Sequence, residues 1–348
     1  MDRWAGAVGL TAILVRQRIR GGRGLTVVLL LSLLTACTSV QAQPPSAGGV
    51  TPLPKPSFAF AVLGDYPYRI AQVQQLPRAV AQINADQQVD LVFHLGDIGA
   101  GARACNTDYY RHIKAEFDKF TKPLVYTFGD NEWTNCSGAD HGNHDPLERL
   151  ATLRRTFIPR AGQTLGKPEA VISQAHLGAP ENVTFIRAET CFAAFHAVGS
   201  RNGNEPWAGN DKATPQQSAE VKTRSAAATR LIHDTFTTAQ RKRCKGLIFA
   251  TQADMFNGTP SSADTAVFRP IIEALAHGAA SYGGPVYLFN GDSHTYNVDQ
   301  PLSQASPWPH AYHVPPAENL TRVTIDGDDN AVGYLTCTIQ PAGSISLI

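Results

Sequence analysis

Four carboxylates in this sequence stand directly behind a short apolar run and a glycine. They close the segments FAFAVLGD, DLVFHLGD, PLVYTFGD and PVYLFNGD, at Asp65, Asp97, Asp130 and Asp292. Short apolar runs of this kind predict strands buried on both faces of a sheet, and open α/β sheets build ligand sites at the carboxyl ends of such strands. We therefore expect the four carboxylates at a single edge. Because gathered carboxylates repel one another, they predict a divalent-metal site.

The chemistry of such a site needs no protein nucleophile. Two metal ions about 3.5–4 Å apart can hold a hydroxide between them and clamp a phosphate for in-line attack. One Gly-Asp after a strand is uninformative, whereas four in one chain favour a shared site. No G-x-S-x-G elbow, P-loop or C-x-x-C is present, which argues against a serine hydrolase, a P-loop nucleotide site and a cysteine zinc site.

The elements that must position these residues alternate between strands and helices. Apolar runs predict strands over 58–63, 91–95, 124–128, 183–187, 191–198, 247–250, 286–289, 321–325 and 333–339. Helical spacing predicts helices over 76–85, 109–120, 146–157, 218–238 and 267–276. Strand, helix, strand order implies parallel pairs joined by crossovers. We expect the last two strands to form a hairpin around the turn Asp326–Asn330, within one domain over 57–348.

The amino-terminal segment has the pattern of an export signal. Arg16, Arg18, Arg20 and Arg23 form a basic flank before the apolar run Leu25–Leu34, which is too short to span a bilayer. Leu34-Thr35-Ala36-Cys37 resembles the lipobox of bacterial lipoproteins, which implies a signal peptide over 1–36 and lipidation of Cys37. An uncleaved anchor or an ordinary secretory signal is the alternative. Residues 37–56 are rich in Pro, Gly and Ser and predict a tether. We expect an exported, membrane-anchored lipoprotein on the periplasmic or cell-surface side.

The charge balance gives no support for a nucleic-acid partner. The 348 residues are 43% hydrophobic and 17% charged, enough for a sizeable core. Residues 1–36 contain five of the 30 basic and one of the 29 acidic residues, so the remainder carries 25 basic and 28 acidic residues. A basic surface is therefore not expected.

Five cysteines remain beyond Cys37. Export favours disulfides. Cys105 and Cys136 follow adjacent Gly-Asp strands, so we expect their loops to meet and pair. Cys191 and Cys244 are a weaker candidate pair, since each borders a predicted strand. The remaining cysteine, Cys337, is expected to be a buried apolar residue.

The order of the motifs over roughly residues 58–300 resembles the calcineurin-like metallophosphoesterase superfamily. There, successive strands end in Asp, in a Gly-Asp whose carboxylate bridges two metals, in Gly-Asn-His-Glu, in His and in Gly-His-x-His. The aligned positions here are Asp65, Gly96-Asp97, Gly129-Asp130-Asn131-Glu132, Gln252 and Gly291-Asp292-Ser293-His294. The resemblance implies an α/β fold, a four-layer α/β/β/α sandwich of two mixed sheets. GDNEW and GDSH further resemble a divergent branch of exported proteins.

The chain departs from the superfamily pattern mainly by losing imidazoles. Pro67 takes the position of a first-motif histidine, and Asp130 replaces a metal-binding asparagine. Asn131 replaces a histidine that assists the leaving group, while Gln252 and Asp292 replace two metal-binding histidines. The oxygen-rich set favours Mg²⁺, Mn²⁺ or Ca²⁺ over Zn²⁺, and iron is not excluded.

The resemblance implies a phosphoesterase with one or two bound ions. The implied metal ligands are Asp65, Asp97, Asp130, Gln252, Asp292 and His294. A metal-bound hydroxide would attack a phosphate mono- or diester of a small molecule or a phosphodiester substrate, with Asp97 and Asn131 as catalytic residues. Asn202, in a Gly-rich loop, is a candidate substrate contact, with a solvated loop as the alternative. The alternative function is a catalytically inactive, metal-stabilised binding lipoprotein of the same fold.

Three histidines need a separate interpretation. His94 and His196 lie within predicted strands and are expected to be hydrogen-bonded core residues. Gly142-Asn143-His144-Asp145 spells the superfamily's third motif, yet no strand precedes it. We therefore assign the third motif to Gly129-Asp130.

Overall fold

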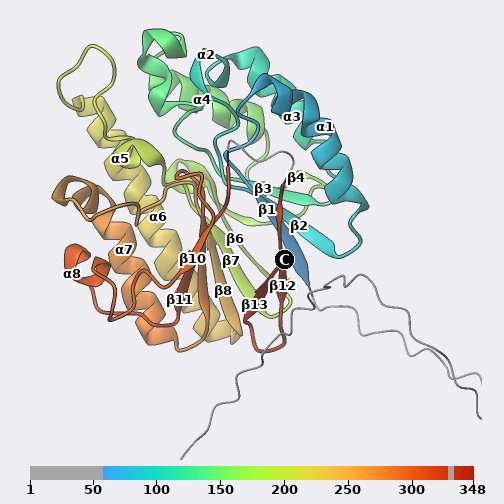
Figure 1. Cartoon of the computed structure of the whole chain (residues 1–348), viewed down its shortest axis with the longest axis vertical. Coiled ribbons are helices and arrows are strands. Elements are labelled where there is room, and N and C mark those ends of the chain that lie inside the picture. Colours follow the sequence, from blue (N-terminus) through green and yellow to red (C-terminus); the bar gives the residue numbers. More distant parts are fainter. Residues whose placement is uncertain (1–57, 328–332) are drawn as a thin grey trace, which may run out of the picture. The chain divides into compact units, whose positions relative to one another are not determined.

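Two mixed β-sheets lie face to face, and each is covered by helices on its outer side, as the computed structural model shows (Figure 1). The structure describes residues 58–327 and 333–348. The chain divides into Met1–Thr51 and Pro52–Ile348, and all described residues belong to the second unit. The architecture is the predicted α/β/β/α sandwich.

The first sheet has three parallel strands in its middle. It consists of β1 (Ala59–Leu63), β2 (Val89–His94), β3 (Pro123–Tyr126), β4 (Leu165–Gly166), β12 (Leu335–Ile339) and β13 (Ile345–Leu347). The strand order is β13-β12-β1-β2-β3-β4. Strands β1, β2 and β3 are parallel, whereas β4, β12 and β13 pair antiparallel with their neighbours. The three central strands are apolar runs that are almost entirely buried, as expected for parallel strands.

The second sheet is longer and also mixed. It consists of β5 (Ile172–Gln174), β6 (Ala179–Arg187), β7 (Thr190–Ala194), β8 (Gly246–Ala250), β9 (Val286–Asn290), β10 (Asn297–Asp299) and β11 (Leu320–Thr324). The strand order is β10-β11-β9-β8-β7-β6-β5. Strands β7, β8, β9 and β11 are parallel, and β5, β6 and β10 run antiparallel to their neighbours.

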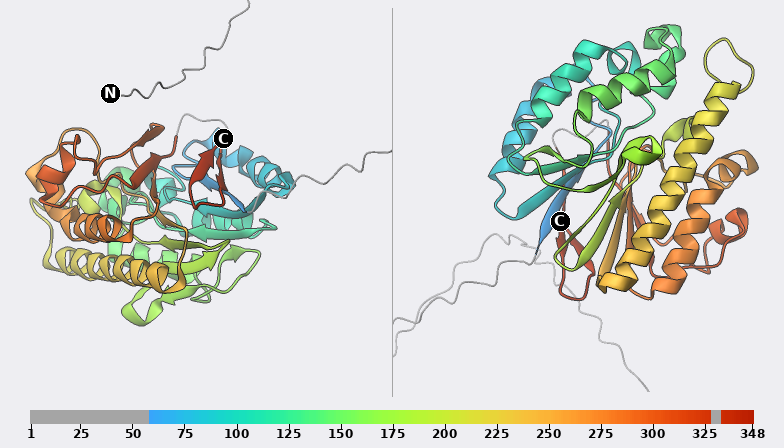
Figure 2. Two further views of the ribbon diagram at one scale, coloured as in Figure 1. Left: turned by 90° about the horizontal axis from the view of Figure 1, so that it is seen from below. Right: turned by 180° about the vertical axis from the view of Figure 1, so that it is seen from behind.

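The helices form the two outer layers (Figure 2). On the first sheet lie α1 (Ile70–Ala85), α3 (Thr107–Phe117) and α4 (Pro146–Phe157); on the second lie α6 (Pro215–Lys242) and α7 (Ser262–Tyr282). Three short helices complete the set: α2 (Gly101–Ala104), α5 (Gly199–Gly203) and α8 (Trp308–Tyr312). None of the helices in residues 58–327 and 333–348 has the length and apolar character of a membrane span.

Aromatic side chains fill the layer between the sheets. Phe60 of β1 packs edge-on against Phe93 at 5.8 Å, Phe192 at 5.8 Å and Phe289 at 5.6 Å between ring centroids. The first two rings come from the first sheet and the other two from the second, and all are at most 1% exposed. This packing locks the two sheets together, which fixes the relative positions of their carboxyl ends.

One expectation about the tail is wrong. The strands predicted over 321–325 and 333–339 do not pair as a hairpin. β11 lies beside β9 in the second sheet, whereas β12 lies beside β1 in the first. Apolar character identified each strand, but the choice of sheet depends on partners distant in sequence. Most of the predicted turn lies outside the described residues, as do the signal segment, the tether and Cys37.

Candidate metal centre

The predicted ligands meet where the carboxyl ends of both sheets adjoin. β1, β2 and β3 of the first sheet lead to Asp65, Asp97 and Asp130, while β8 and β9 of the second lead to Gln252 and Asp292. The expectation of a single sheet edge is therefore corrected: two edges contribute. Hydrogen bonds join them, because the Asp292 amide donates to Asp65 Oδ2 over 3.0 Å and Gln252 Nε2 donates to Asp97 Oδ2 over 3.2 Å.

Gly96 and Gly129 allow the turns that follow β2 and β3 to pack against each other. A Cβ on Gly96 would lie 2.6 Å from the Gly129 nitrogen, and one on Gly129 would lie 1.9 Å from Asp97 Oδ1. Gly96 also has a φ of 89°, and Asp97 has a φ of 54°. Backbone conformations of this kind are costly for most side chains and cluster at functional sites. The Gly-Asp motif is thus a packing requirement that turns the carboxylate toward the centre.

Asp65, Asp97 and His294 form a group suited to hold a metal ion. One ligand atom from each lies within 4.8 Å of the other two. Asp65 is fully buried, Asp97 is 2% exposed, and the His294 side chain is 32% exposed. His294 Nε2 lies 3.5 Å from Asp65 Oδ1. Two buried carboxylates and a more accessible imidazole are a usual donor set for a divalent ion with an open position.

Tyr68 is a central residue that the sequence analysis did not identify. Its hydroxyl donates to Asp97 Oδ2 over 2.7 Å and accepts from Asn131 Nδ2 over 2.8 Å. It also lies 3.1 Å from His294 Nε2. Burial, together with the charges of Asp97 and Asp65, raises the pKa of Tyr68, so the hydroxyl keeps its proton. The only sequence signal was its place three residues after Asp65.

Gln252 lies among three carboxylates and is fully buried. Its Nε2 lies 3.2 Å from Asp97 Oδ2, 3.3 Å from Asp130 Oδ1 and 3.2 Å from Asp292 Oδ1. Its Oε1 points the other way and accepts the Gly199 amide over 2.7 Å. The amide group therefore acts as a donor toward the centre.

Neutral donors also bind the outer oxygens of the second group of carboxylates. Ser200 Oγ donates to Asp130 Oδ2 over 2.6 Å, and Asn135 Nδ2 donates to the same oxygen over 3.0 Å. The Asp254 amide donates to Asp292 Oδ2 over 3.2 Å. Ser200, another residue that the sequence analysis missed, has a φ of 49°, and this left-handed backbone turns its hydroxyl toward Asp130.

The electrostatics of the centre are those of an uncompensated acidic cluster. Burial, and then the charges of Asp130, Glu132 and Asp65, raise the pKa of Asp97 well above its usual range. Burial, and then Asp130 and Asp65, do the same for Asp292. The pKa of Asp65 is raised by burial, and His294 lowers it in part. Among the described residues, no lysine or arginine forms an ion pair with any of these carboxylates.

Glu132 links the end of β3 to the turns that follow β2 and β3. It is fully buried and its Oε1 accepts the Tyr126 hydroxyl over 2.7 Å, the Gly129 amide over 3.2 Å and the Ile98 amide over 3.4 Å. Burial raises the pKa of Glu132, against the lowering effect of its hydrogen bonds to Asp97 and Tyr126. Its contacts position the turns that carry the ligands.

Asn202 does not face the centre, which corrects the expectation of a substrate contact. It is fully buried. Its Oδ1 accepts the Arg224 guanidinium and the Val198 amide, and its Nδ2 donates to Ser225 Oγ over 3.0 Å. With these partners it shapes the loop that presents Ser200.

Asn131 lies at the centre, but its amide is occupied. Nδ2 donates to the Tyr68 hydroxyl and, over 3.1 Å, to the Gly99 carbonyl. Its backbone amide donates to Asp97 Oδ1 over 3.1 Å. Asn131 therefore orients Asp97 and Tyr68, and a carboxamide cannot donate a proton as an acid does.

The second occurrence of the third motif belongs to a helix terminus. Asp145 caps α4, accepting the Leu147 amide over 2.8 Å, and the chain around it is largely exposed. His94, as expected, is buried and bonded, with Nε2 2.8 Å from the Tyr66 carbonyl. His196 is also buried and contacts Glu181.

Two disulfides are present in the part of the chain that the structure describes. Cys105–Cys136 joins the loops after β2 and β3, with an S–S distance of 1.98 Å, and Cys191–Cys244 joins β7 to the segment before β8. Cys337 is free and buried. The first disulfide lies next to the Asn131 carbonyl, 3.5 Å from Cys105 Sγ, so it restrains the loop that carries Asp130 and Asn131.

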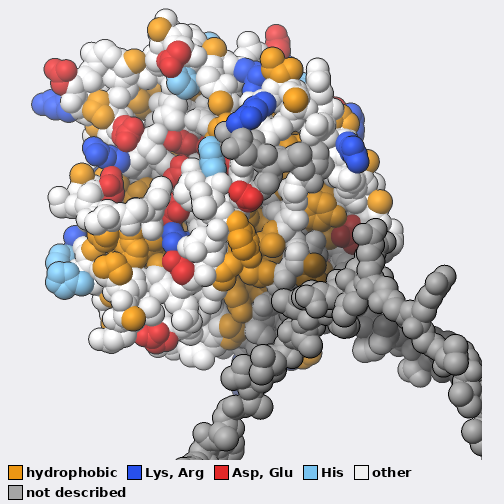
Figure 3. Space-filling model, viewed as in Figure 1, with side chains coloured by type: hydrophobic (Ala, Val, Ile, Leu, Met, Phe, Trp, Pro, Cys, Tyr) orange, Lys and Arg blue, Asp and Glu red, His pale blue; other side chains and the backbone are white. Residues whose placement is uncertain are grey.

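A small cavity adjoins the centre on the side of Asp292. A pocket of about 310 Å³ is lined by Gly199, Ser200, Asp254, Asp292 and Trp308, among other residues. Figure 3 shows acidic side chains and a histidine gathered in the middle of one face. A volume of this size is at the lower end of pockets that take small molecules.

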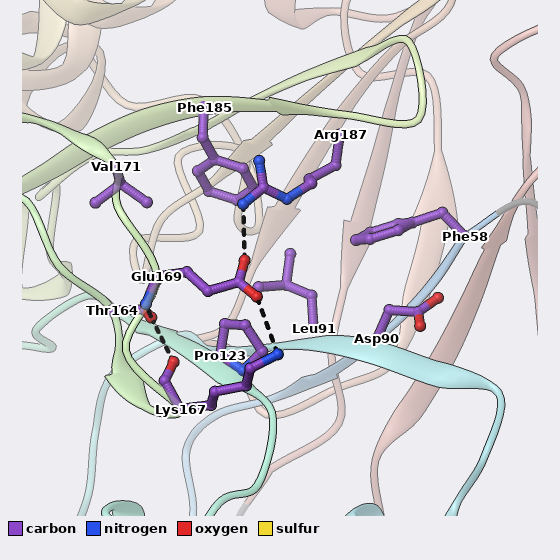
Figure 4. A pocket seen from close by; sticks show the side chains of 10 residues that line it. All are labelled: Phe58, Asp90, Leu91, Pro123, Thr164, Lys167, Glu169, Val171, Phe185 and Arg187. Atoms are coloured by element: carbon purple, nitrogen blue, oxygen red, sulfur yellow. Dashed lines mark hydrogen bonds and ion pairs between the residues drawn. The ribbon is translucent and has the colours of Figure 1, made fainter.

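A second pocket lies at the opposite ends of the strands of the first sheet. It measures about 370 Å³ and is lined by Phe58, Asp90 and Pro123, which stand at the amino ends of β1, β2 and β3. Glu169 pairs there with Arg187 at 2.7 Å and Lys167 at 3.5 Å (Figure 4). These charges are balanced, and none of the predicted site residues lies there.

Comparisons with known proteins give only distant structural similarity. No protein-family model and no curated protein matches the chain. Among solved structures, the chain is similar to GAP50, the anchor in the inner membrane complex of Plasmodium, with 12% identity, a TM-score of 0.44 and 81% of each chain covered. It is also similar to a Staphylococcus aureus protein provisionally called a 5′-nucleotidase, in complex with α-ketoglutarate, with 13% identity and a TM-score of 0.43. That match covers 84% of this chain and about half, 52%, of the other. At these scores neither similarity assigns a family or an activity.

Proposed function

We propose that this protein is a metal-dependent phosphoester hydrolase of the calcineurin-like type. One observation carries the proposal: Asp65, Asp97 and His294 place three ligand atoms within 4.8 Å of one another beside further carboxylates that have no cationic partner among the described residues. Such a cluster requires positive charge from outside the chain. A pocket of small-molecule size lies beside the further carboxylates, where Asp292 and Ser200 line it.

The donor chemistry fits a divalent ion. Carboxylate oxygens predominate, which favours Mg²⁺, Mn²⁺ or Ca²⁺, and His294 also permits Zn²⁺ or iron. Asp65, Asp97 and His294 would hold it. A bound ion supplies Lewis-acid activation of water and neutralises charge on a phosphoryl oxygen.

The remaining groups at the centre orient the ligand Asp97 and line the neighbouring cavity. Tyr68 stays protonated and fixes Asp97 Oδ2, and the Asn131 backbone amide fixes Asp97 Oδ1. Ser200, held on Asp130, lines the cavity in which a leaving group would lie. Because Asn131, whose carboxamide cannot act as an acid, stands where the superfamily has its leaving-group histidine, we expect substrates with good leaving groups to be favoured.

The substrate class and location follow from the same reasoning. The cavity volume favours a phosphorylated small molecule, with phosphodiesters included. Two disulfides are typical of proteins exported to an oxidising compartment, which supports export. Attachment to a membrane through a lipidated Cys37 remains part of the proposal.

The test combines metal content with activity. The purified protein is assayed on a general phosphomonoester and phosphodiester with Mg²⁺, Mn²⁺, Ca²⁺ or Zn²⁺, and after chelation. We expect metal-dependent hydrolysis, and we expect Asp97→Asn to lower kcat/KM by about 10³-fold or more, or about 4 kcal/mol. Asp108→Asn is the matched control, because Asp108 is 86% exposed on α3. Activity that survives Asp97→Asn, or is absent with every metal, refutes the proposal.

A second candidate is a metal-stabilised binding protein without catalysis. The occupied amide of Asn131, which replaces the superfamily's leaving-group histidine, favours this alternative. The two functions differ in outcome. A binding protein would take up metal and gain thermal stability from it, yet hydrolyse neither ester.

A further inference from the structure

Gln252 divides the centre into two halves with different occupants. On one side, one ligand atom each of Asp65, Asp97 and His294 lies within 4.8 Å of the other two, and the neighbouring Tyr68 hydroxyl has an oxygen that can itself face a cation. On the other, the Gln252 amide nitrogen lies between Asp97, Asp130 and Asp292. We propose that the centre takes a single divalent ion, in the first half, and that the Gln252 amide replaces a second ion in the other. This inference rests on the proposed function, since it concerns the metal of that site.

The orientation of the Gln252 amide is fixed by its surroundings. Oε1 accepts the Gly199 amide over 2.7 Å. If the amide were turned over, the NH₂ would face the Gly199 N–H, and Oε1 would face three carboxylate oxygens. Both contacts would be repulsive, whereas the observed orientation pairs Oε1 with a donor and turns the two N–H donors toward the three carboxylate oxygens. The oxygen of Gln252 is therefore turned away from the centre and is not available as a ligand.

The position of the nitrogen excludes an ion from the second half. Nε2 lies 3.2–3.3 Å from one oxygen of each of the three carboxylates. A cation shared by the same oxygens would need contacts of about 2.0–2.6 Å, so it would require the space that the NH₂ group takes up. Gln252 is fully buried. Withdrawal of its side chain would break the bond that Oε1 accepts from the Gly199 amide.

The backbone at Gly199 keeps Gln252 in place. A Cβ on Gly199 would lie 2.3 Å from Asp292 Oδ1 and 2.9 Å from Asp130 Oδ2. Gly199, whose amide donates to the Gln252 oxygen, is thus packed directly against Asp292 and Asp130, two of the carboxylates that face the Gln252 nitrogen. Gly199, the Gln252 amide and the carboxylates of Asp130 and Asp292 are therefore in mutual contact.

The other oxygens of the second half are satisfied by neutral donors. Asp130 Oδ2 accepts Ser200 and Asn135, and Asp292 Oδ2 accepts the Asp254 amide. These bonds do not depend on Gln252. They provide an independent reason to assign hydrogen-bond donors, instead of a metal, to Asp130 and Asp292.

The experiment counts ions in the full chain. Mn²⁺ is titrated into the metal-free protein by calorimetry, the bound metal is measured by mass spectrometry, and the Mn²⁺ state is observed by electron paramagnetic resonance. We expect one ion per chain with the hyperfine-split signal of an isolated ion. Asp97→Asn should abolish this binding, which places the ion at the centre.

Two variants test the role of Gln252. Gln252→Ala removes the amide and opens the space, and Gln252→His replaces it with a ligand. Both are expected to bind two ions, with a spin-coupled Mn²⁺ signal in Gln252→His. Gln300→Ala, which alters an exposed glutamine whose amide bonds to Glu318, is the matched control and should bind one ion.

The possible results separate the two proposals. Two coupled ions in the wild-type protein overturn the single-ion inference and leave the proposed function intact. One ion in the wild type and also in both Gln252 variants overturns the role of Gln252. If the wild type binds no ion with any metal, the proposed function itself fails. Because the wild-type measurement needs no substitution, the inference stays testable even if a variant does not fold.

Discussion

Two buried acidic regions of this molecule differ in whether positively charged side chains pair with their carboxylates. At the metal centre, four aspartates converge, and among the described residues no lysine or arginine pairs with them; only Asp65 has a histidine, His294, nearby at 3.5 Å. On β6 of the second sheet, the buried Glu181 side chain lies between Arg154, at 2.6 Å, and His196, at 2.8 Å. Burial would raise the pKa of Glu181, but the hydrogen bond and charge of His196, with those of Arg154, hold it at about 2. The pKa of Asp97 moves the other way.

The contrast identifies which cluster needs an external partner. Carboxylates that serve the fold alone are paired within the chain, because an uncompensated buried charge is costly. A group of carboxylates that still repel one another in the folded protein needs a positive charge from a bound ion or ligand. In this protein the second description fits only the centre at the strand ends, within the part of the chain that the structure describes.

The largest effect on stability is expected at the balanced cluster. Glu181→Gln leaves His196 and Arg154 without their buried partner, so we expect the free energy of unfolding to fall by about 3–5 kcal/mol. Urea denaturation measures it. Glu169→Gln is the control, since Glu169 pairs with a 42% exposed Arg187 and should cost at most about 1 kcal/mol. Equal losses in the two variants would remove the distinction between the clusters.

The pH dependence of unfolding should have opposite signs at the two clusters. Glu181 has a folded pKa of about 2 against an ordinary 4.5, so it contributes about 3 kcal/mol above pH 4.5 that is lost as the pH falls toward 2. Asp97 and Asp292 have raised pKa values. They therefore favour folding below about pH 3.8, and the metal-free protein should lose that contribution as the pH rises through their folded pKa.

Unfolding of the metal-free protein across pH tests this opposition. Saturating Mg²⁺ or Mn²⁺ should reduce the loss at higher pH, because the ion compensates the ionised carboxylates. A metal-free stability that instead increases steadily up to neutral pH would mean that the acidic centre is balanced from within.

The smallest expected effect is a gain. In the absence of metal, Asp97→Asn removes one repulsive charge and keeps an oxygen for the Asn131 amide, but it takes an acceptor from the Tyr68 hydroxyl and the Gln252 amide, so we expect a net stabilisation of at most about 1 kcal/mol. Thermal unfolding in a chelator measures this, with Asp108→Asn as an exposed control. A clear destabilisation would show that Asp97 is compensated by the chain itself.

The sequence predicted the strands of the centre because they are continuous apolar runs, and it predicted Asp65, Asp97 and Asp130 at their ends because Gly-Asp turns are local features. The joining of two sheet edges was not predictable in detail, since the sheet assignment of β11 and β12 depends on distant partners. Tyr68 escaped notice because its hydroxyl reaches Asp97 across the fold. For Gln252 the sequence gives the amide, but not which of its two atoms faces the carboxylates.

The burial of Asn202 was likewise not predictable from the sequence. Its place in a polar, Gly-rich loop indicated exposure, but the loop folds inward onto Arg224 of α6. Only the helix, which follows later in the chain, makes that burial possible.

The pairing of β1 with β12 has a consequence for how the domain forms. Ala59, in the first described strand, is aligned with Thr338 in the second-to-last, so the strand that carries Asp65 gains its outer neighbour only when a segment far along the chain arrives. Contacts of such high sequence separation slow folding. Until then β1 presents an unpaired edge, which is a template for aggregation. A chain cut before β12 would keep every proposed metal ligand and still be prone to associate through that edge.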